Sequence, residues 1–203
     1  MSKLELFYPA SPVHINQGFG LNPDYYAKFH DAFGNPMKGH NGVDFMAVHG
    51  QPVYAPMDGK AMYTIDVHGG QSVLIRTNDA MDYAGGACWF NVVLGHVIGD
   101  TDPLFAPPIP MNMVQTQVKT GDLVAYANNT GAPYESSGDH LHFGLAPVDT
   151  NGKALFPANG YASYIDPTPY FNGYLAKDAV TVFATLNKLL STLKALFAKL
   201  KGV

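Results

Sequence analysis

The segment GDHLHFGLAP (Gly138–Pro147) predicts a β-strand and places two histidines on it. Its centre, HLHFGL, alternates polar and apolar side chains with the period of two that is typical of a half-buried strand. His140 and His142 therefore point to one face, about 6.6–6.8 Å apart at Cα, while Leu141 and Phe143 point into the core. Both imidazoles can serve one site, either as two metal ligands or as a ligand and a base.

Six segments that precede this one have the same short, turn-bounded character. Each is bounded by Gly, Pro, Asn or Asp, which is typical of strands, and the turn His68–Gly70 predicts a hairpin. The 21 Gly and 15 Pro make up about 18% of the chain, so we expect a loop-rich, mostly β fold. The six predicted strands are residues 42–47, 52–56, 59–67, 71–77, 89–97 and 122–127.

The C-terminal segment differs from the body in charge and in periodicity. Residues 1–175 hold seven Lys and Arg against fifteen Asp and Glu, whereas residues 176–203 hold five Lys against one Asp. Apolar residues recur there every three or four positions, which predicts an amphipathic helix, so we expect a body at 1–174 and a helix at 175–203. The helix either packs on the body or on its own copy, or it contacts an anionic membrane surface or another protein. The apolar stripe consists of Phe183, Leu186, Leu190, Leu193, Phe197 and Leu200.

Length and composition exclude several classes of protein. The 203 residues, 47% hydrophobic and 14% charged, fit one domain with an appendage. A single cysteine, Cys88, excludes an internal disulfide framework and a cysteine-based zinc cluster. The net charge of -4 gives no reason to expect nucleic acid as a partner. No run of 18 apolar residues is present, and the first residues show no signal-peptide pattern.

A second histidine motif, His40-Asn-Gly-Val-Asp44, begins the first predicted strand. Asp44 lies on the face opposite Val43 and Phe45, and Gly42 gives the backbone freedom to turn just before it. Two imidazoles and one carboxylate from the two motifs would form a His₂Asp set, which suits a catalytic zinc site with an open fourth position. Short motifs also occur by chance. A third stretch, His96 to Asp100, has the same spacing and illustrates this.

Several motifs together resemble the M23 family of zinc metallopeptidases, the lysostaphin-type, LytM-like peptidoglycan endopeptidases. The two histidine motifs stand within the longer stretches GHNGVDFMAVHGQPVYAPMDGKA (39–61) and GDHLHFGLAP, with GH at 95–96 between them. The resemblance covers residues 17–169 and includes QGFG (17–20), KTGDLVAYANNTG (119–131) and IDPTPYF (165–171). The order and spacing of several motifs match at once, which is more specific than either short motif.

The resemblance implies a role for each of the five matching positions. His40, Asp44 and His142 match the family's ligands to one zinc ion, and His96 and His140 match its two catalytic histidines. Asp100 is then incidental. The implied fold is an antiparallel β-sheet with a groove for a peptide, and the implied partner is bacterial peptidoglycan.

Other positions bear on the predicted groove. The Pro-rich segment 100–117 is longer than in the family, so we expect it to rebuild one groove wall. In latent members of the family an N-terminal Asn occupies the metal's fourth position. Asn16 and Asn22 are the candidates for that residue in this chain. Four tyrosines are candidates for the groove wall, with ordinary half-buried aromatic side chains as the alternative: Tyr25, Tyr26, Tyr83 and Tyr134.

The resulting prediction is a zinc endopeptidase that cuts stem peptides or cross-bridges of peptidoglycan. The alternatives are an inactive module that binds the wall or activates other hydrolases, and a carboxypeptidase that removes terminal D-alanine. Because no export signal is visible, we expect a lysin that reaches the wall after release from the cytoplasm or on a phage particle. The bond that is cut and the oligomeric state are left open by the sequence.

Overall fold

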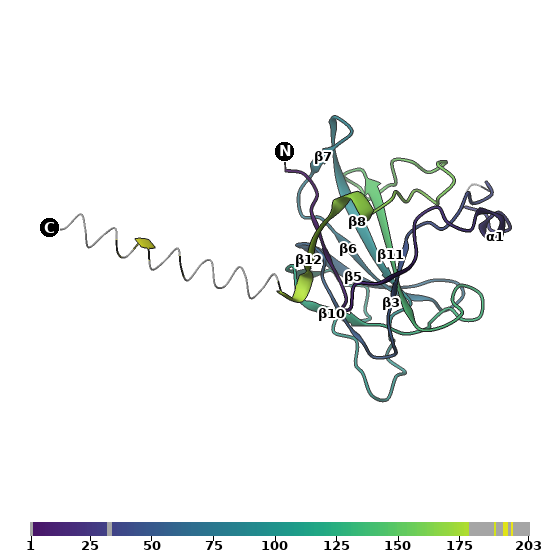
Figure 1. Ribbon diagram of the computed structural model, residues 1–203, viewed down its shortest axis with the longest axis horizontal. Helices are drawn as coiled ribbons and strands as arrows, with labels where there is room; N and C mark the ends of the chain where they lie inside the picture. Colours follow the sequence, from purple (N-terminus) through teal and green to yellow (C-terminus); the bar gives the residue numbers. More distant parts are fainter. Residues whose placement is uncertain (1, 32–33, 179–188, 190–192, 195, 197–203) are drawn as a thin grey trace.

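A computed structural model describes residues 2–31, 34–178, 189, 193, 194 and 196. Its centre is an eight-stranded antiparallel sheet in the order β2-β3-β11-β8-β6-β5-β9, with β7 paired to β8 (Figure 1). A parallel pair, β1–β12, and an antiparallel pair, β4–β10, complete the fold. The elements are β1 Leu6–Tyr8, β2 Ile15–Gln17, α1 Pro23–Tyr26, β3 Val43–Met46, β4 Pro52–Tyr54, β5 Gly59–Ile65, β6 Gln71–Arg76, β7 Met81–Tyr83, β8 Gly86–Gly95, β9 Thr116–Val118, β10 Leu123–Tyr126, β11 His140–Val148, the 3-10 helix η1 Thr168–Tyr170, and β12 Phe171–Leu175.

The prediction of a mostly β, antiparallel fold is confirmed. Alternation along the strands buries one face of the sheet: Leu141 and Phe143 of β11 are fully buried, as is Leu94 of β8. The small pairs β1–β12 and β4–β10 contribute buried residues to the same core. The turn predicted at His68–Gly70 joins β5 and β6.

The opposite face of the sheet carries the polar side chains of the two histidine motifs. Strand β11 lies between β3 and β8, and its register places His142 directly opposite both Asp44 of β3 and Gly95 of β8. Since paired residues of adjacent strands lie about 4.5–5.5 Å apart, this register brings together groups that are distant in the sequence. His96 follows β8 directly and so lies at the same end of the sheet.

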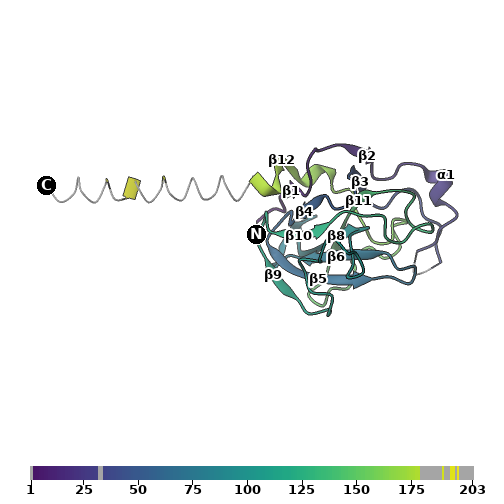
Figure 2. The ribbon, with the colours of Figure 1, turned by 90° about the horizontal axis from the view of Figure 1, so that it is seen from below.

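Helix α1 and the N-terminus lie at opposite margins of the body (Figures 1 and 2). The predicted amphipathic helix at 175–203 lies largely outside the described residues, so that helix and its contacts stay a prediction. Within the described part of the chain, no helix combines the length and apolar character needed to cross a bilayer.

Candidate metal centre and groove

His40, Asp44 and His142 converge at the meeting point of β3 and β11, and we call these three residues the ligand group. The Nδ1 of His142 lies 3.0 Å from Oδ1 of Asp44, and Nε2 of His40 lies 3.2 Å from the same oxygen. The two ring nitrogens are 3.1 Å apart. The three atoms therefore form a nearly equilateral triangle, as the sequence-based ligand set requires.

The ligand group fits a zinc ion by geometry and by donor chemistry. Ligand atoms at about 2.0 Å from a tetrahedral zinc are separated by about 3.3 Å, close to the three distances seen here. The Nδ1 of His40 donates to the carbonyl oxygen of Gly18 at 3.3 Å. Its Nε2 therefore carries no hydrogen, and the lone pair of that nitrogen is available to a metal. Two imidazoles and a carboxylate also match the ligands preferred by catalytic zinc.

The ring of His142 has room only because position 42 is a glycine. A Cβ on Gly42 would lie 2.6 Å from Cε1 of His142 and 2.5 Å from the carbonyl oxygen of Phe143. Gly42 does not have a positive φ, so the sequence-based reason for this glycine, freedom to turn, is wrong. The glycine is required by the close approach of the β3 segment to β11.

Electrostatics within the ligand group favour a charged carboxylate at Asp44 and a neutral ring at His142. Burial raises the pKa of Asp44, but hydrogen bonds and charges from His142 and His40 outweigh this, so that its pKa lies well below the usual range. Burial lowers the pKa of His142, although Asp44 opposes the change. A carboxylate and neutral imidazoles are the forms in which these groups bind metal.

His96 and His140 lie beside the ligand group, with ring centroids 4.5 Å apart. The Nε2 of His140 lies 3.8 Å from Oδ1 of Asp44. The ring of His96 is 6.1 Å from that of His142 between centroids. All five residues that the resemblance singles out therefore lie together in the structure.

Both rings are oriented by the segment 128–138, which we call the orienting loop. The Nδ1 of His96 donates to the carbonyl oxygen of Thr130 at 2.7 Å, and Nδ1 of His140 donates to that of Gly138 at 2.8 Å. Each ring, when neutral, is thereby fixed in the tautomer whose Nε2 is free to accept a proton. The buried hydroxyl of Ser136 adds a contact 3.3 Å from Nδ1 of His140.

His96 has two further features that are unusual for a surface histidine. Its backbone lies in the left-handed region, with φ of 60°, a conformation that is uncommon for residues other than glycine. Burial lowers the pKa of His96 to about 4, with added effects of His142 and His140. The imidazole is therefore neutral at neutral pH and retains a lone pair for proton transfer.

The ligand group lies in a groove of about 840 Å³ that crosses the sheet. On one side it is lined by Tyr25 and Tyr26 of α1, and on the other by Tyr134 in the orienting loop. Tyr26 accepts a hydrogen bond from Gln17 at 2.9 Å, and burial together with the charge of Asp44 raises its pKa to about 12. Three of the four tyrosines considered for the wall therefore line the groove.

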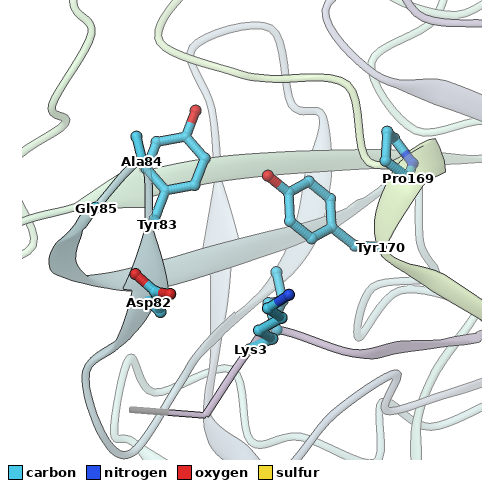
Figure 3. Close-up of a pocket in the computed structure, with 8 residues that line it drawn as sticks. Lys3, Asp82, Tyr83, Ala84, Gly85, Pro169 and Tyr170 are labelled. Carbon is cyan, nitrogen blue, oxygen red and sulfur yellow. The ribbon is translucent and has the colours of Figure 1, made fainter.

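The fourth tyrosine, Tyr83, lies elsewhere. It lines a separate hollow of about 490 Å³ with Lys3, Asp82 and Tyr170 (Figure 3). This hollow contains no histidine, so its described lining residues do not form a second centre of the predicted kind. Asp100 of the chance motif is exposed and lines neither cavity.

The expected role of the Pro-rich segment 100–117 is not seen. None of the described residues that line the groove belongs to it. Instead, Asp102 pairs with His49 at 2.9 Å, and Phe105 packs against Tyr126 with centroids 5.0 Å apart. Asp102 and Phe105 thus hold the segment against the β3–β4 connection and β10, and the rebuilt groove wall stays a prediction.

In the part of the chain that the structure describes, no hydrogen bond links either asparagine considered as a plug to the ligand group. Asn22 lines the groove and Asn16 does not, and neither side chain hydrogen-bonds to His40, Asp44 or His142 among the described residues. Sequence reasoning missed the orienting residues Thr130, Ser136 and Gly138. No spacing rule links the carbonyl of Thr130 to the ring of His96, 34 positions away, and the turn before β11 gives no signal for the contacts of Ser136 and Gly138 with His140.

No protein-family model matches the sequence. The curated DD-carboxypeptidase/endopeptidase Mpg of Neisseria meningitidis serogroup B is 26% identical over 194 residues, which cover 92% of this chain and 36% of that protein. The chain thus spans about a third of the length of the curated relatives that it matches.

Solved structures show the same relationship. The structure of LytU is 26% identical with a TM-score of 0.50, and the match covers 84% of this chain and 90% of that one. The antimicrobial peptidase lysostaphin from Staphylococcus simulans is 21% identical with a TM-score of 0.51, over 78% of this chain and 48% of that one. The likeness to lysostaphin-type M23 peptidases that the motifs predicted is therefore confirmed, and it includes the fold.

Proposed function

We propose that this chain is a zinc-dependent peptidase that hydrolyses peptide bonds in the stems or cross-bridges of bacterial peptidoglycan. The observation that carries the proposal is the convergence of the ligand group with His96 and His140 in one groove. The similar proteins support it, since Mpg is named as a carboxypeptidase and endopeptidase and lysostaphin as a peptidase. All five matching positions are filled, which disfavours an inactive wall-binding module.

His40, Asp44 and His142 would hold the zinc ion. When bound there, zinc would lower the pKa of a water molecule toward 7 and polarise the scissile carbonyl. His96 and His140 would move the proton: one neutral Nε2 accepts it from the attacking water and a protonated ring returns it to the leaving amine. The carbonyls of Thr130 and Gly138 keep both rings in the required tautomer.

The groove has walls on both sides of the ligand group. The aromatic wall at α1 lies beyond β3, whereas the wall formed by His68 and Tyr134 lies at the β5–β6 turn. The ligand group lies between them, at β3 and β11. A groove that is open at both ends would favour cleavage within a chain, and one blocked at an end would favour removal of a terminal residue. Action as a lysin, released from the cytoplasm or carried on a phage particle, stays a prediction from sequence.

The test is metal content together with amine release from purified peptidoglycan. We expect about one zinc per chain by elemental analysis, new amino groups during digestion, and loss of both after treatment with a chelator. Mass spectrometry of the fragments identifies the bond that is cut. A protein that binds the wall but holds no zinc and releases no amines contradicts the proposal and supports the wall-binding module instead.

A further inference from the structure

The orienting loop does not stand alone, because it contacts the turn between β5 and β6. The ring of Tyr134 stacks on that of His68, with centroids 5.2 Å apart and planes at 29°. The hydroxyl of Thr130 accepts a hydrogen bond from the backbone N–H of Gln71 at 3.0 Å. The same residue, Thr130, holds the ring of His96 through its carbonyl. The turn and the rings are therefore linked through a few direct contacts.

The third contact is between two carboxyl groups, Asp66 of the turn and Glu135 of the loop, whose oxygens meet over Gly70. Asp66 is fixed from its own side, since Oδ1 accepts the backbone N–H groups of His68 at 2.8 Å and Gly70 at 2.9 Å. Its Oδ2 and Oε2 of Glu135 both lie above Gly70, within 2.2 and 2.6 Å of where a Cβ would be. Only glycine leaves room for this meeting of the two acids.

A hydrogen bond between two carboxyl groups requires that one of them carries a proton. Burial, together with Asp66, raises the pKa of Glu135 to about 7, whereas the pKa of Asp66 is lowered by the hydrogen bonds it accepts despite its own burial. Among the described residues, no Lys or Arg forms an ion pair with either acid, and the titratable groups facing the pair are His68 and Tyr134. Glu135 is thus the group that holds the proton.

We propose that Asp66 and Glu135 share a proton in a hydrogen bond over Gly70, and that this bond is a clasp that fixes the orienting loop, and through it the rings of His96 and His140. Asp66 and Glu135 are then positioning residues for the hydrolysis, an inference that rests on the proposed function. Both acids and both histidines line the same groove. Ser136, directly after Glu135, touches His140, so a movement of the clasp reaches that ring within one residue.

The clasp is expected to be closed only within a limited pH range. Glu135 binds its proton more tightly in the folded protein than in the unfolded chain, so its stabilising effect is present at low pH and is lost as pH rises through about 7. Asp66 acts in the opposite sense, since its lowered pKa makes the charged form favourable and its contribution is lost only in acid. The clasp is therefore closed in mildly acidic solution and opens as the second carboxylate forms.

The test compares Glu135→Gln with Glu135→Ala in the zinc-loaded chain of 203 residues. Glutamine donates to Asp66 without titrating, so it keeps the clasp closed at every pH, whereas alanine removes it. Amide hydrogen exchange of residues 131–136, corrected for intrinsic rates, is measured at about pH 6 and about pH 8.5. We expect loop protection in the parent to fall about tenfold between these values, to stay constant in Glu135→Gln, and to be low throughout in Glu135→Ala.

The pH dependence of kcat is the second measurement on the same variants. The ratio of kcat for Glu135→Gln to that of the parent should rise with pH, because other titrations affect both proteins alike. Glu5→Gln, a change at the chain's only other glutamate, is the control and should follow the parent. Equal pH dependence of loop protection in the parent and Glu135→Gln overturns the clasp. A parent that hydrolyses no peptidoglycan contradicts the proposed function instead, and hydrogen exchange still decides whether the clasp exists.

Discussion

The two parts of the candidate site are held in different ways. The ligand group lies on or beside two paired strands, where ladder hydrogen bonds set His142 opposite Asp44. The rings of His96 and His140 depend on carbonyl groups of the orienting loop. Strands give the fixed distances that a metal requires, and a loop gives two proton-carrying rings an orientation that other contacts can adjust. Damage to the two parts should therefore have different signatures.

The largest effect is expected where the strand-held part is broken. In Asp44→Ala the triangle of ligand atoms loses the oxygen shared by both histidines, so zinc binding should be lost and kcat/KM should fall by about a thousandfold or more. Zinc content and amine release measure the two effects. Asp100→Ala, at the chance repeat of the motif, is the matched control and should keep both. Equal loss in the two variants would contradict the assignment of the ligand group.

A smaller effect with a different signature is expected where the loop-held part is broken. His96→Ala should keep its zinc, because His96 is not in the ligand group, but should lose about a hundredfold or more in kcat as proton transfer fails. Zinc content and kcat are measured on the same sample. If zinc is lost together with activity, the division of the site into two separately held parts is wrong.

The smallest effect is expected from crowding at Gly42, where the β3 segment closely approaches β11. Gly42→Ala places a Cβ against the ring of His142 and the backbone of Phe143, which should cost about 1–3 kcal/mol of stability and weaken zinc binding. Thermal unfolding and a zinc titration measure these. Gly86→Ala is the matched control, since its Cβ would meet only one atom, the carbonyl oxygen of Tyr83, at 3.8 Å. A Gly42→Ala protein with the affinity of the control would show that this position tolerates a methyl group.

The outcome of the sequence predictions follows the same division. The alternation of β11 placed His140 and His142 on one face, and the structure confirms that arrangement. Spacing alone did not separate His40 and Asp44 from the chance repeat at His96 and Asp100, and only the likeness to a known family did so. The contact between Thr130 and His96, and the place of segment 100–117, could not be predicted, because they join residues more than thirty positions apart without any periodic signal.

The sequence by itself determined seven of the twelve strands and the residue types available for a metal, since alternation and turn residues act within a few positions of the chain. It did not predict β1, β2, β7, β9 and β12. Tertiary structure alone decided which carboxylate faces which imidazole, which rings share a groove, and that Asp66 meets Glu135 over a glycine. These depend on strand register and on loop packing, where the free energy comes from contacts between distant segments and not from any local pattern.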